Sequence, residues 1–312
     1  MTAHRNFLLL VTLAAAAVTP AVAQTTLPAV AAGSTATPGA APIPDFSGIW
    51  AHLTWPDVEP PRSGPGPVRN LTLRNGAPDI YKLVGDYKNP ILRPQAAAAV
   101  KRQGEIESSA GPAATPSNQC WPGGMPFVLS SNIGMQMLQR RDEITILYTN
   151  DHEVRRVRMN QPHPAQVTPS WYGDSVGHYE GDTLVIDTVG VKIGPFAMLD
   201  MYGTPHSPAL HVVEHYRLLD YEAAKEAQER GQRELTRFGR DPGLVPNPNY
   251  KGKGLQLEFT VEDGGVFTVP WSAAVSYRRP TGDWPEVACA ESADGYWPGR
   301  HVAAPTADKS DF

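Results

Sequence analysis

The stretch between residues 163 and 215 concentrates side chains that can transfer protons. Five of the nine histidines lie there, together with six carboxylates. A carboxylate and an imidazole often work together in general acid–base chemistry near neutral pH, because their surroundings can shift their pKa values apart. We therefore interpret this stretch as a candidate acid–base site. It contains His163, Asp174, His178, Glu180, Asp182, Asp187, Asp200, His206, His211, Glu214 and His215.

Glu214 lies on a predicted strand over residues 210–219, whose other even-numbered positions are apolar. A carboxylate on such a face must be ion-paired, or neutral with a raised pKa. Two interpretations stay open. Glu214 is a general acid or base in a barrel pocket, or it forms an ion pair with Arg156 or Arg158.

Asp187 lies near the end of a predicted strand over residues 183–189, and His206 lies in a proline-flanked loop. We predict that one carboxylate, Glu214 or Asp187, acts with one imidazole, His206 or His211. The alternatives are a turn or ladder partner for Asp187 and a loop-bracing role for His206. The residues predicted to bind substrate are Tyr172, His178, Trp50 and Asp200. A tryptophan buried in the β-core is the alternative for Trp50.

Metal binding is a second chemistry that these residue types allow. His211 and His215 are four residues apart, a spacing that would place both on one face of a helix. The alternation around them predicts a strand instead, where their Cα atoms lie about 13 Å apart and cannot share one ion. A site of His206 with Asp187 or Asp200 is the alternative to our prediction of no metal.

The sequence also lacks the motifs of nucleotide-dependent enzymes and of zinc metalloproteases. It contains no H-E-x-x-H, P-loop, G-x-G-x-x-G or C-x-x-C pattern, and its one G-x-S-x-G match, GDSVG at residues 173–177, lies in a predicted strand hairpin. The formal net charge of −5 leaves no basic footprint for nucleic acid. We therefore predict no cofactor, no nucleic-acid partner, and a small molecule as substrate or ligand. The oligomeric state is not predicted.

The amino-terminal residues have the organisation of an export signal. Residues 1–23 contain one arginine, an apolar run over 7–18 and a small-residue cleavage site, Ala21-Val22-Ala23. The run is too short to span a bilayer and no later stretch approaches about 20 apolar residues, so we predict no membrane anchor. Residues 24–44 predict a flexible linker. The expected location is periplasmic or secreted.

Export changes the interpretation of the two cysteines. Cys120 and Cys289 are the only cysteines in the chain, and an oxidising compartment favours their pairing. We predict a disulfide between them. The alternatives are a nucleophilic thiol beside a histidine, or two unpaired structural thiols.

Turn-forming residues dominate the rest of the chain, with 28 glycines and 31 prolines among 312 residues. We expect a mainly β fold, an antiparallel, lipocalin-like barrel with two short helices and long loops, as one domain over residues 45–312. Strands are predicted at 45–53, 143–150, 154–159, 175–179, 183–189, 210–219, 255–262 and 266–279, and helices at 94–105 and 221–238.

Several motifs together resemble a large, mostly uncharacterised family of exported bacterial proteins. They are DFSGIW at 45–50, CWPGGMP at 120–126, GDSVGHYEGDTLVIDT at 173–188, TVPW at 268–271 and EVACAE at 286–291. Members carry a PDxSGxW start and a (W/Y)EGDTLVVDT hairpin, usually with Trp where this chain has Tyr179 and often with Arg where it has His215. The resemblance implies a β-rich fold and an export route, and it implies no reaction or catalytic residue.

These observations favour an exported, cofactor-independent enzyme. Its chemistry would be hydration, elimination, isomerisation or cleavage of a small apolar or aromatic substrate. The alternative is a non-catalytic periplasmic binding protein for a lipid, terpenoid, aromatic or sugar ligand. A third class is an envelope protein that contacts partners through the charged helix predicted at 221–238.

Overall fold

A computed structural model describes residues 43–52, 58–74, 77–79, 81–131, 134–149, 153–234 and 246–289. The predicted signal peptide, and the predicted linker up to residue 42, lie outside the described residues. The last residues of the helix predicted at 221–238 also lie outside them.

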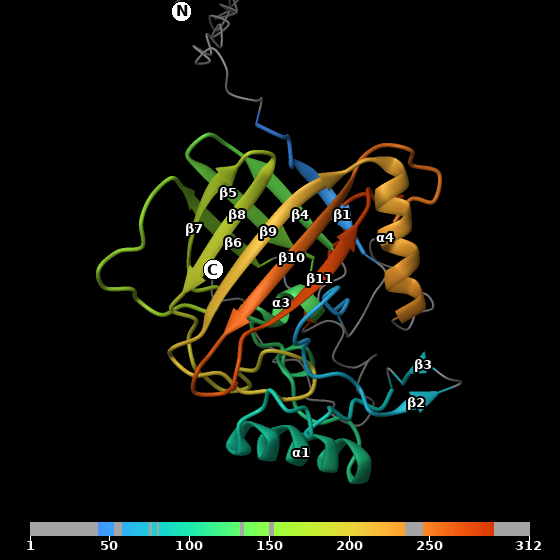
Figure 1. The fold of residues 1–312 in the computed structure, drawn as a ribbon, viewed down its shortest axis with the longest axis vertical. Helices are drawn as coiled ribbons and strands as arrows, with labels where there is room; N and C mark the ends of the chain where they lie inside the picture. Colours follow the sequence, from blue (N-terminus) through green and yellow to red (C-terminus); the bar gives the residue numbers. More distant parts are fainter. Residues whose placement is uncertain are drawn as a thin grey trace, which may run out of the picture. The chain divides into compact units, whose positions relative to one another are not determined.

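The main feature is a nine-stranded sheet that curves into a nearly closed barrel (Figure 1). The two edges of the sheet meet at Ala51 of the first strand and Arg278, which directly follows the last strand. These two residues exchange two backbone hydrogen bonds of 2.8 Å. The prediction of a mainly β barrel is confirmed. In sheet order the strands are β1 (Gly48–Ala51), β4 (Gly134–Gln139), β5 (Glu143–Tyr148), β6 (Val154–Met159), β7 (Asp174–Glu180), β8 (Thr183–Val189), β9 (His211–Leu219), β10 (Gly254–Glu262) and β11 (Trp271–Tyr277). A separate pair is formed by β2 (Leu73–Arg74) and β3 (Ala77–Pro78).

One strand pairing departs from the antiparallel pattern. β6 and β7 are parallel, with Val157 opposite Ser175, and the other pairings of the nine-stranded sheet are antiparallel. Parallel neighbours need a crossover longer than a hairpin turn, and residues 160–173 supply it. This loop carries His163 back along the sheet to the start of β7.

Alternation along the strands fills the interior of the barrel. On β5, Ile144, Ile146 and Tyr148 are buried, while the residues between them are partly exposed. The same alternation on β6, β9 and β10 places aromatic and aliphatic side chains inside. Trp50, Tyr148 and Tyr216 are among the largest side chains that are fully buried. The barrel interior is therefore a packed core.

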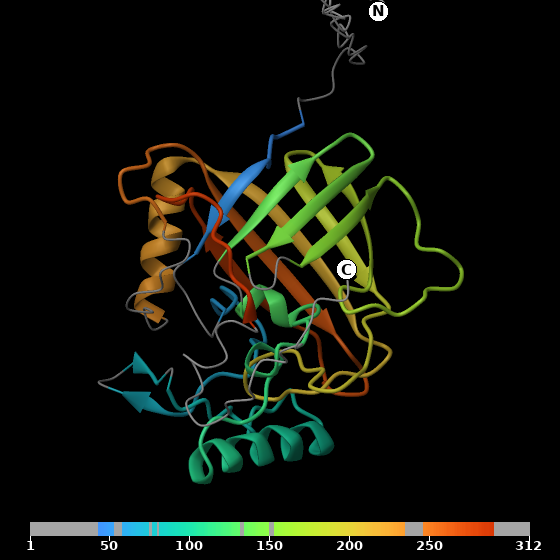
Figure 2. The ribbon, with the colours of Figure 1, turned by 180° about the vertical axis from the view of Figure 1, so that it is seen from behind.

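The described residues also form four helices, α1 (Pro94–Ser109), α2 (Pro116–Gln119), α3 (Phe127–Ser131) and α4 (Tyr221–Glu234). Both predicted helices form: α1 begins at Pro94, and α4 packs along the outside of the barrel (Figures 1 and 2). The approach of α4 is close, because a Cβ added at Gly254 would lie 2.4 Å from the Cβ of Ala224. In the part of the chain that the structure describes, no helix has the length and apolar character to cross a bilayer.

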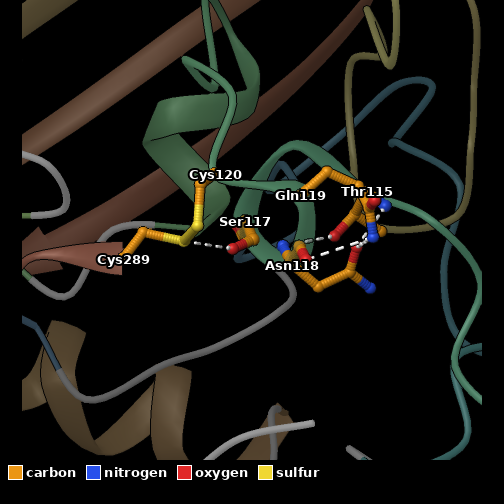
Figure 3. Close-up of a disulfide and its surroundings, with 6 residues drawn as sticks. All are labelled: Thr115, Ser117, Asn118, Gln119, Cys120 and Cys289. Carbon is orange, nitrogen blue, oxygen red and sulfur yellow. Dashed lines mark hydrogen bonds between the residues drawn. A yellow bond between two sulfur atoms is a disulfide. The ribbon is translucent and has the colours of Figure 1, made fainter. Parts of the chain in front are cut away.

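The predicted disulfide is confirmed. Cys120 and Cys289 are bonded, with 5.4 Å between their Cα atoms (Figure 3). Cys120 directly follows α2, whose first turn is closed by a capping box between Thr115 and Asn118. The bond therefore ties a well-capped turn to a segment 169 residues further along the chain.

Candidate active site

Glu214 is fully buried inside the barrel and forms an ion pair with Arg155. Arg155 Nη1 lies 3.0 Å from Glu214 Oε1, and Nη2 lies 2.5 Å from Oε2. The ion-pair interpretation is therefore confirmed, but the predicted partners, Arg156 and Arg158, are wrong. Arg155 shares its strand face with the buried Val157 and Met159, whereas Arg156 and Arg158 point to the other face.

The remaining hydrogen-bonding groups around this pair are also occupied. Arg155 Nε donates to Ser175 Oγ at 3.0 Å and Nη2 donates to Thr188 Oγ1 at 2.6 Å. The hydroxyl of Tyr216 donates to Glu214 Oε1 at 2.8 Å. A buried ion pair is tolerated when such bonds satisfy both partners, so this network is complete without a ligand.

The electrostatics of the interior also oppose proton transfer. Burial is the largest single influence on Arg155 and works to lower its pKa, but Glu214, Tyr148 and Tyr216 together outweigh it and raise the pKa. Burial raises the pKa of Tyr148 to about 12. These groups hold their protons throughout the physiological range. The geometry of Glu214 is that of a structural ion pair, and it offers no support for a catalytic role.

Asp187 and His211 meet on the outer face of the same sheet. Asp187 pairs with Val213 in the register of β8 and β9, so His211 is its diagonal neighbour across the strands. His211 Nε2 lies 2.8 Å from Asp187 Oδ2. The structure thus brings together one carboxylate and one imidazole of the predicted acid–base set.

A second histidine joins this pair from the crossover loop. His163 Nε2 lies 2.8 Å from Asp187 Oδ1, and its Nδ1 lies 2.6 Å from Asp174 Oδ1. Each oxygen of Asp187 is therefore in contact with a different imidazole. His163 can donate to both carboxylates only when both ring nitrogens carry protons.

Further charged residues extend the row of contacting side chains Asp174, His163, Asp187 and His211 at both of its ends. Arg158 donates to both oxygens of Asp174, at 2.7 and 2.9 Å. At the other end, Glu262 Oε2 lies 3.6 Å from His211 Nδ1. We call this series the outer chain; it consists of Arg158, Asp174, His163, Asp187, His211 and Glu262.

The outer chain keeps its two aspartates ionised. Burial works to raise the pKa of Asp187, but hydrogen bonds from His211 and His163 outweigh it and hold the pKa below its ordinary value. For Asp174, hydrogen bonds from Arg158 and His163 likewise outweigh burial and lower the pKa. About a third of the Asp187 and His211 side chains is exposed, so solvent or a substrate can reach them.

Sequence reasoning did not place His163 among the proposed catalytic residues. Its loop position gives no periodic signal, and only the parallel crossover from β6 to β7 brings it beside Asp187. Its membership of the histidine-rich stretch was the one available indication.

Two of the predicted substrate-binding residues are part of the core. Trp50 is 1% exposed, donates its indole N–H to the carbonyl of Phe46 at 2.8 Å, and lies beneath the Arg279 guanidinium, 3.6 Å from the ring centre. Tyr172 is buried and stacks on Tyr148 with ring centres 5.6 Å apart. The alternative of a tryptophan buried in the β-core therefore describes Trp50.

The other predicted residues form no hydrogen bond or ion pair with Asp187 or His211. His178 is half-exposed and contacts Glu180 at 3.0 Å. Asp200 is buried, which raises its pKa, and it accepts backbone N–H bonds from Tyr202 and Thr204 in its own loop. His206 is largely buried, and burial lowers its pKa.

Glu214 lines neither of two hollows that lie between described residues. The smaller has a volume of about 20 Å³, is lined by Asp200, Tyr202 and Trp271 among others, and has room for about one water molecule. The larger is an open groove of about 620 Å³ between three loops, with walls that include Pro61, Pro67 and Val269.

Within the described residues, no three His, Cys, Asp or Glu side chains are arranged to hold a metal ion. His211 and His215 lie on a strand, as predicted, and so are too far apart to share one ion. Comparison with protein families, with curated proteins and with solved structures finds no match to this chain.

Proposed function

We propose that this protein is an exported enzyme that transfers protons at the Asp187–His211 pair without an organic cofactor. The observation that carries the proposal is the 2.8 Å contact between His211 Nε2 and Asp187 Oδ2 on a partly exposed sheet face. An imidazole oriented by a carboxylate through one nitrogen presents the other nitrogen to a reactant. The reaction class is hydration, elimination, isomerisation or cleavage of a small substrate.

The roles of the residues follow from the contacts. When His211 Nε2 carries the ring proton and donates a hydrogen bond to Asp187, Nδ1 is the unprotonated, basic nitrogen of the ring. Nδ1 removes a proton from the substrate, and Asp187 stabilises the imidazolium that forms. Glu262, 3.6 Å from Nδ1, can then receive or return that proton. His163 holds the second oxygen of Asp187 and so acts as a positioning residue.

Export into an oxidising compartment is part of the proposal. The Cys120–Cys289 disulfide supports it, because disulfides persist mainly in such compartments. The signal-like residues 1–23 support the same route.

The proposal is tested with 5-nitrobenzisoxazole, whose isoxazole ring opens to a coloured phenolate when a base removes the proton on C3 and the N–O bond breaks. The wild-type protein should open it faster than free imidazole at equal concentration. His211→Gln and Asp187→Asn should each lower kcat/KM by about 10²-fold, the lower range of general base catalysis.

His215→Gln is the matched control. His215 lies on the same strand and the same outer face as His211, opposite Glu258 of β10, and it forms no ion pair with a described residue. Its replacement should leave the rate unchanged. A wild-type rate no greater than that of imidazole, or full activity in His211→Gln, would reject the proposal.

The open groove of about 620 Å³ supports a second candidate function, non-catalytic binding of a small apolar ligand. Its volume falls in the usual range for small-molecule sites. Its polar side chains bond to neighbouring loops, since Asn89 donates to Pro67 and Thr268 to Pro90. A retained small molecule in native mass spectrometry, without turnover of the probe, would favour this function.

A further inference from the structure

An aromatic cluster lies on the loops that adjoin the outer chain. The rings of Trp121 and Trp171 meet edge-to-face with centres 5.7 Å apart, and those of Trp121 and Phe196 with centres 6.2 Å apart. We call these three residues the aromatic patch. They come from three different loops, and Trp121 directly follows the disulfide-bonded Cys120.

The aromatic patch remains open to solvent. Trp121 is 38% exposed, and Trp171 and Phe196 are half-buried. Phe196 adopts a backbone φ of +59°, a left-handed conformation that is unusual for a bulky residue. Such conformations persist where the surroundings hold them, and they gather at ligand sites. The exposed indole of Trp121, packed edge-to-face against the other two rings, presents a flat surface on which a planar ring can stack.

A cation lies at the edge of the aromatic patch. Lys192 Nζ is 5.4 Å from the centre of the Trp171 ring. Lys192 is exposed, and it forms no ion pair with the residues that the structure describes. Its charge is thus available to an anionic group of a ligand that stacks on the rings.

Chain connections place the aromatic patch near the proposed catalytic pair. Trp171 precedes Asp174 by three residues, and Lys192 follows Asp187 by five. Extended chain therefore limits these separations to about 11 and 18 Å between Cα atoms. Two backbone hydrogen bonds clamp the loops together, from Ser170 N to Gly190 O at 3.2 Å and from Lys192 N to Ser170 O at 2.8 Å.

We infer that the aromatic patch and Lys192 bind an aromatic ring that carries a carboxylate group. The ring stacks on Trp121 and the carboxylate meets Lys192 Nζ. That this ligand is a substrate rests on the proposed function, because the catalytic pair supplies the chemistry. That the aromatic patch binds it rests only on the contacts of the loops.

Isothermal titration of the wild-type protein with three probes tests the inference without any variant. 4-Nitrobenzoate has the ring and the charge, 4-nitrobenzamide has only the ring, and cyclohexanecarboxylate has only the charge. The expected order of affinity places 4-nitrobenzoate first, with each partial probe roughly 3- to 10-fold weaker. Equal affinities for 4-nitrobenzoate and 4-nitrobenzamide, or no measurable binding of 4-nitrobenzoate, would overturn the inference.

Two variants assign the binding to the named residues. Trp121→Leu should weaken both aromatic probes, and Lys192→Met should remove the preference for the carboxylate. Lys88→Met is the matched control, because Lys88 Nζ lies over Tyr87 in a similar arrangement, 5.9 Å from the ring centre. Thermal melts check that each variant is folded. Unchanged binding in a folded Lys192→Met variant would overturn the assignment.

His211→Gln separates this inference from the proposed function. The variant should bind 4-nitrobenzoate as tightly as the wild type, although it opens 5-nitrobenzisoxazole about 10²-fold less efficiently. Probe binding without any wild-type turnover supports the aromatic patch and rejects the enzyme. Turnover without probe binding rejects the aromatic patch and leaves the enzyme standing.

Discussion

The same four strands build two polar series, one on each face of the sheet. The inner series contains Arg155, Ser175, Thr188 and Glu214, and the outer series contains Arg158, Asp174, Asp187 and His211. In each series, β6, β7, β8 and β9 contribute one residue. Both contain an arginine paired with a carboxylate, yet their surroundings differ completely.

This difference separates structural from chemical use of similar groups. Inside the barrel, Glu214 is fully buried, and its two oxygens accept hydrogen bonds from Arg155 and Tyr216. A charge change there would leave a buried group unpaired at high cost. On the outer face, His211 has one nitrogen held by Asp187 and the other within reach of solvent and Glu262. Only the outer series can therefore exchange a proton with a reactant.

The largest expected effect is on the inner series. Glu214→Gln should lower the free energy of unfolding by about 3–5 kcal/mol, because it leaves the Arg155 charge buried without its partner. Urea denaturation followed by circular dichroism measures this loss. A change below about 1 kcal/mol would show that the pair does not hold the barrel together.

Replacing both partners sharpens the same test. The double variant Arg155→Met and Glu214→Leu removes both charges and fills similar volume, so it should recover most of the stability that Glu214→Gln loses. It should also keep its activity if the outer series alone does the chemistry. Loss of activity in a folded double variant would give the inner pair a functional role.

The outer series should show the opposite balance of effects. Asp187→Asn should change the free energy of unfolding by less than about 1 kcal/mol, because partly exposed ion pairs contribute little. It should still remove most proton-transfer activity. Parallel denaturation and rate measurements on the one variant test this split, and a large stability loss would place Asp187 with the structural residues.

The smallest effect is expected in acid. The pKa of Asp187 is lowered in the folded protein from an ordinary value of 3.8. Its contribution to stability is therefore fully present above that value and is lost as the pH falls through the lower folded-state pKa. The stability difference between wild type and Asp187→Asn should shrink from pH 5 towards pH 2. A difference that grows on acidification would mean that the pKa is raised instead.

Local patterns predicted much of the fold because they depend on neighbours in sequence. Alternation located β5, β8 and β9 to within a few residues, and it placed Glu214 on the inner face. Pro94 marked the start of α1. With only two cysteines in an export-like sequence, one disulfide was the simplest pairing.

Partner choice was less predictable, because it depends on register across strands. In the segment VRRVRM, Val154 and Val157 lie on opposite faces, so hydrophobicity alone does not show which arginine turns inward. Because Val157 and Met159 are buried against the core, Arg155, which shares their face of the strand, also points inward. For the same reason, the sequence indicated Asp187 and His211 as candidates but not their contact.

The sequence by itself determined the β-rich class, most strand positions and the residue types available for acid–base chemistry. Hydrophobic periodicity and turn-forming residues act over a few residues, so the local sequence predicts strands and turns directly. Only the tertiary structure decided that Glu214 is neutralised by Arg155, and that a parallel crossover brings His163 to Asp187. Those outcomes depend on which strands become neighbours, and packing of the whole barrel sets that arrangement.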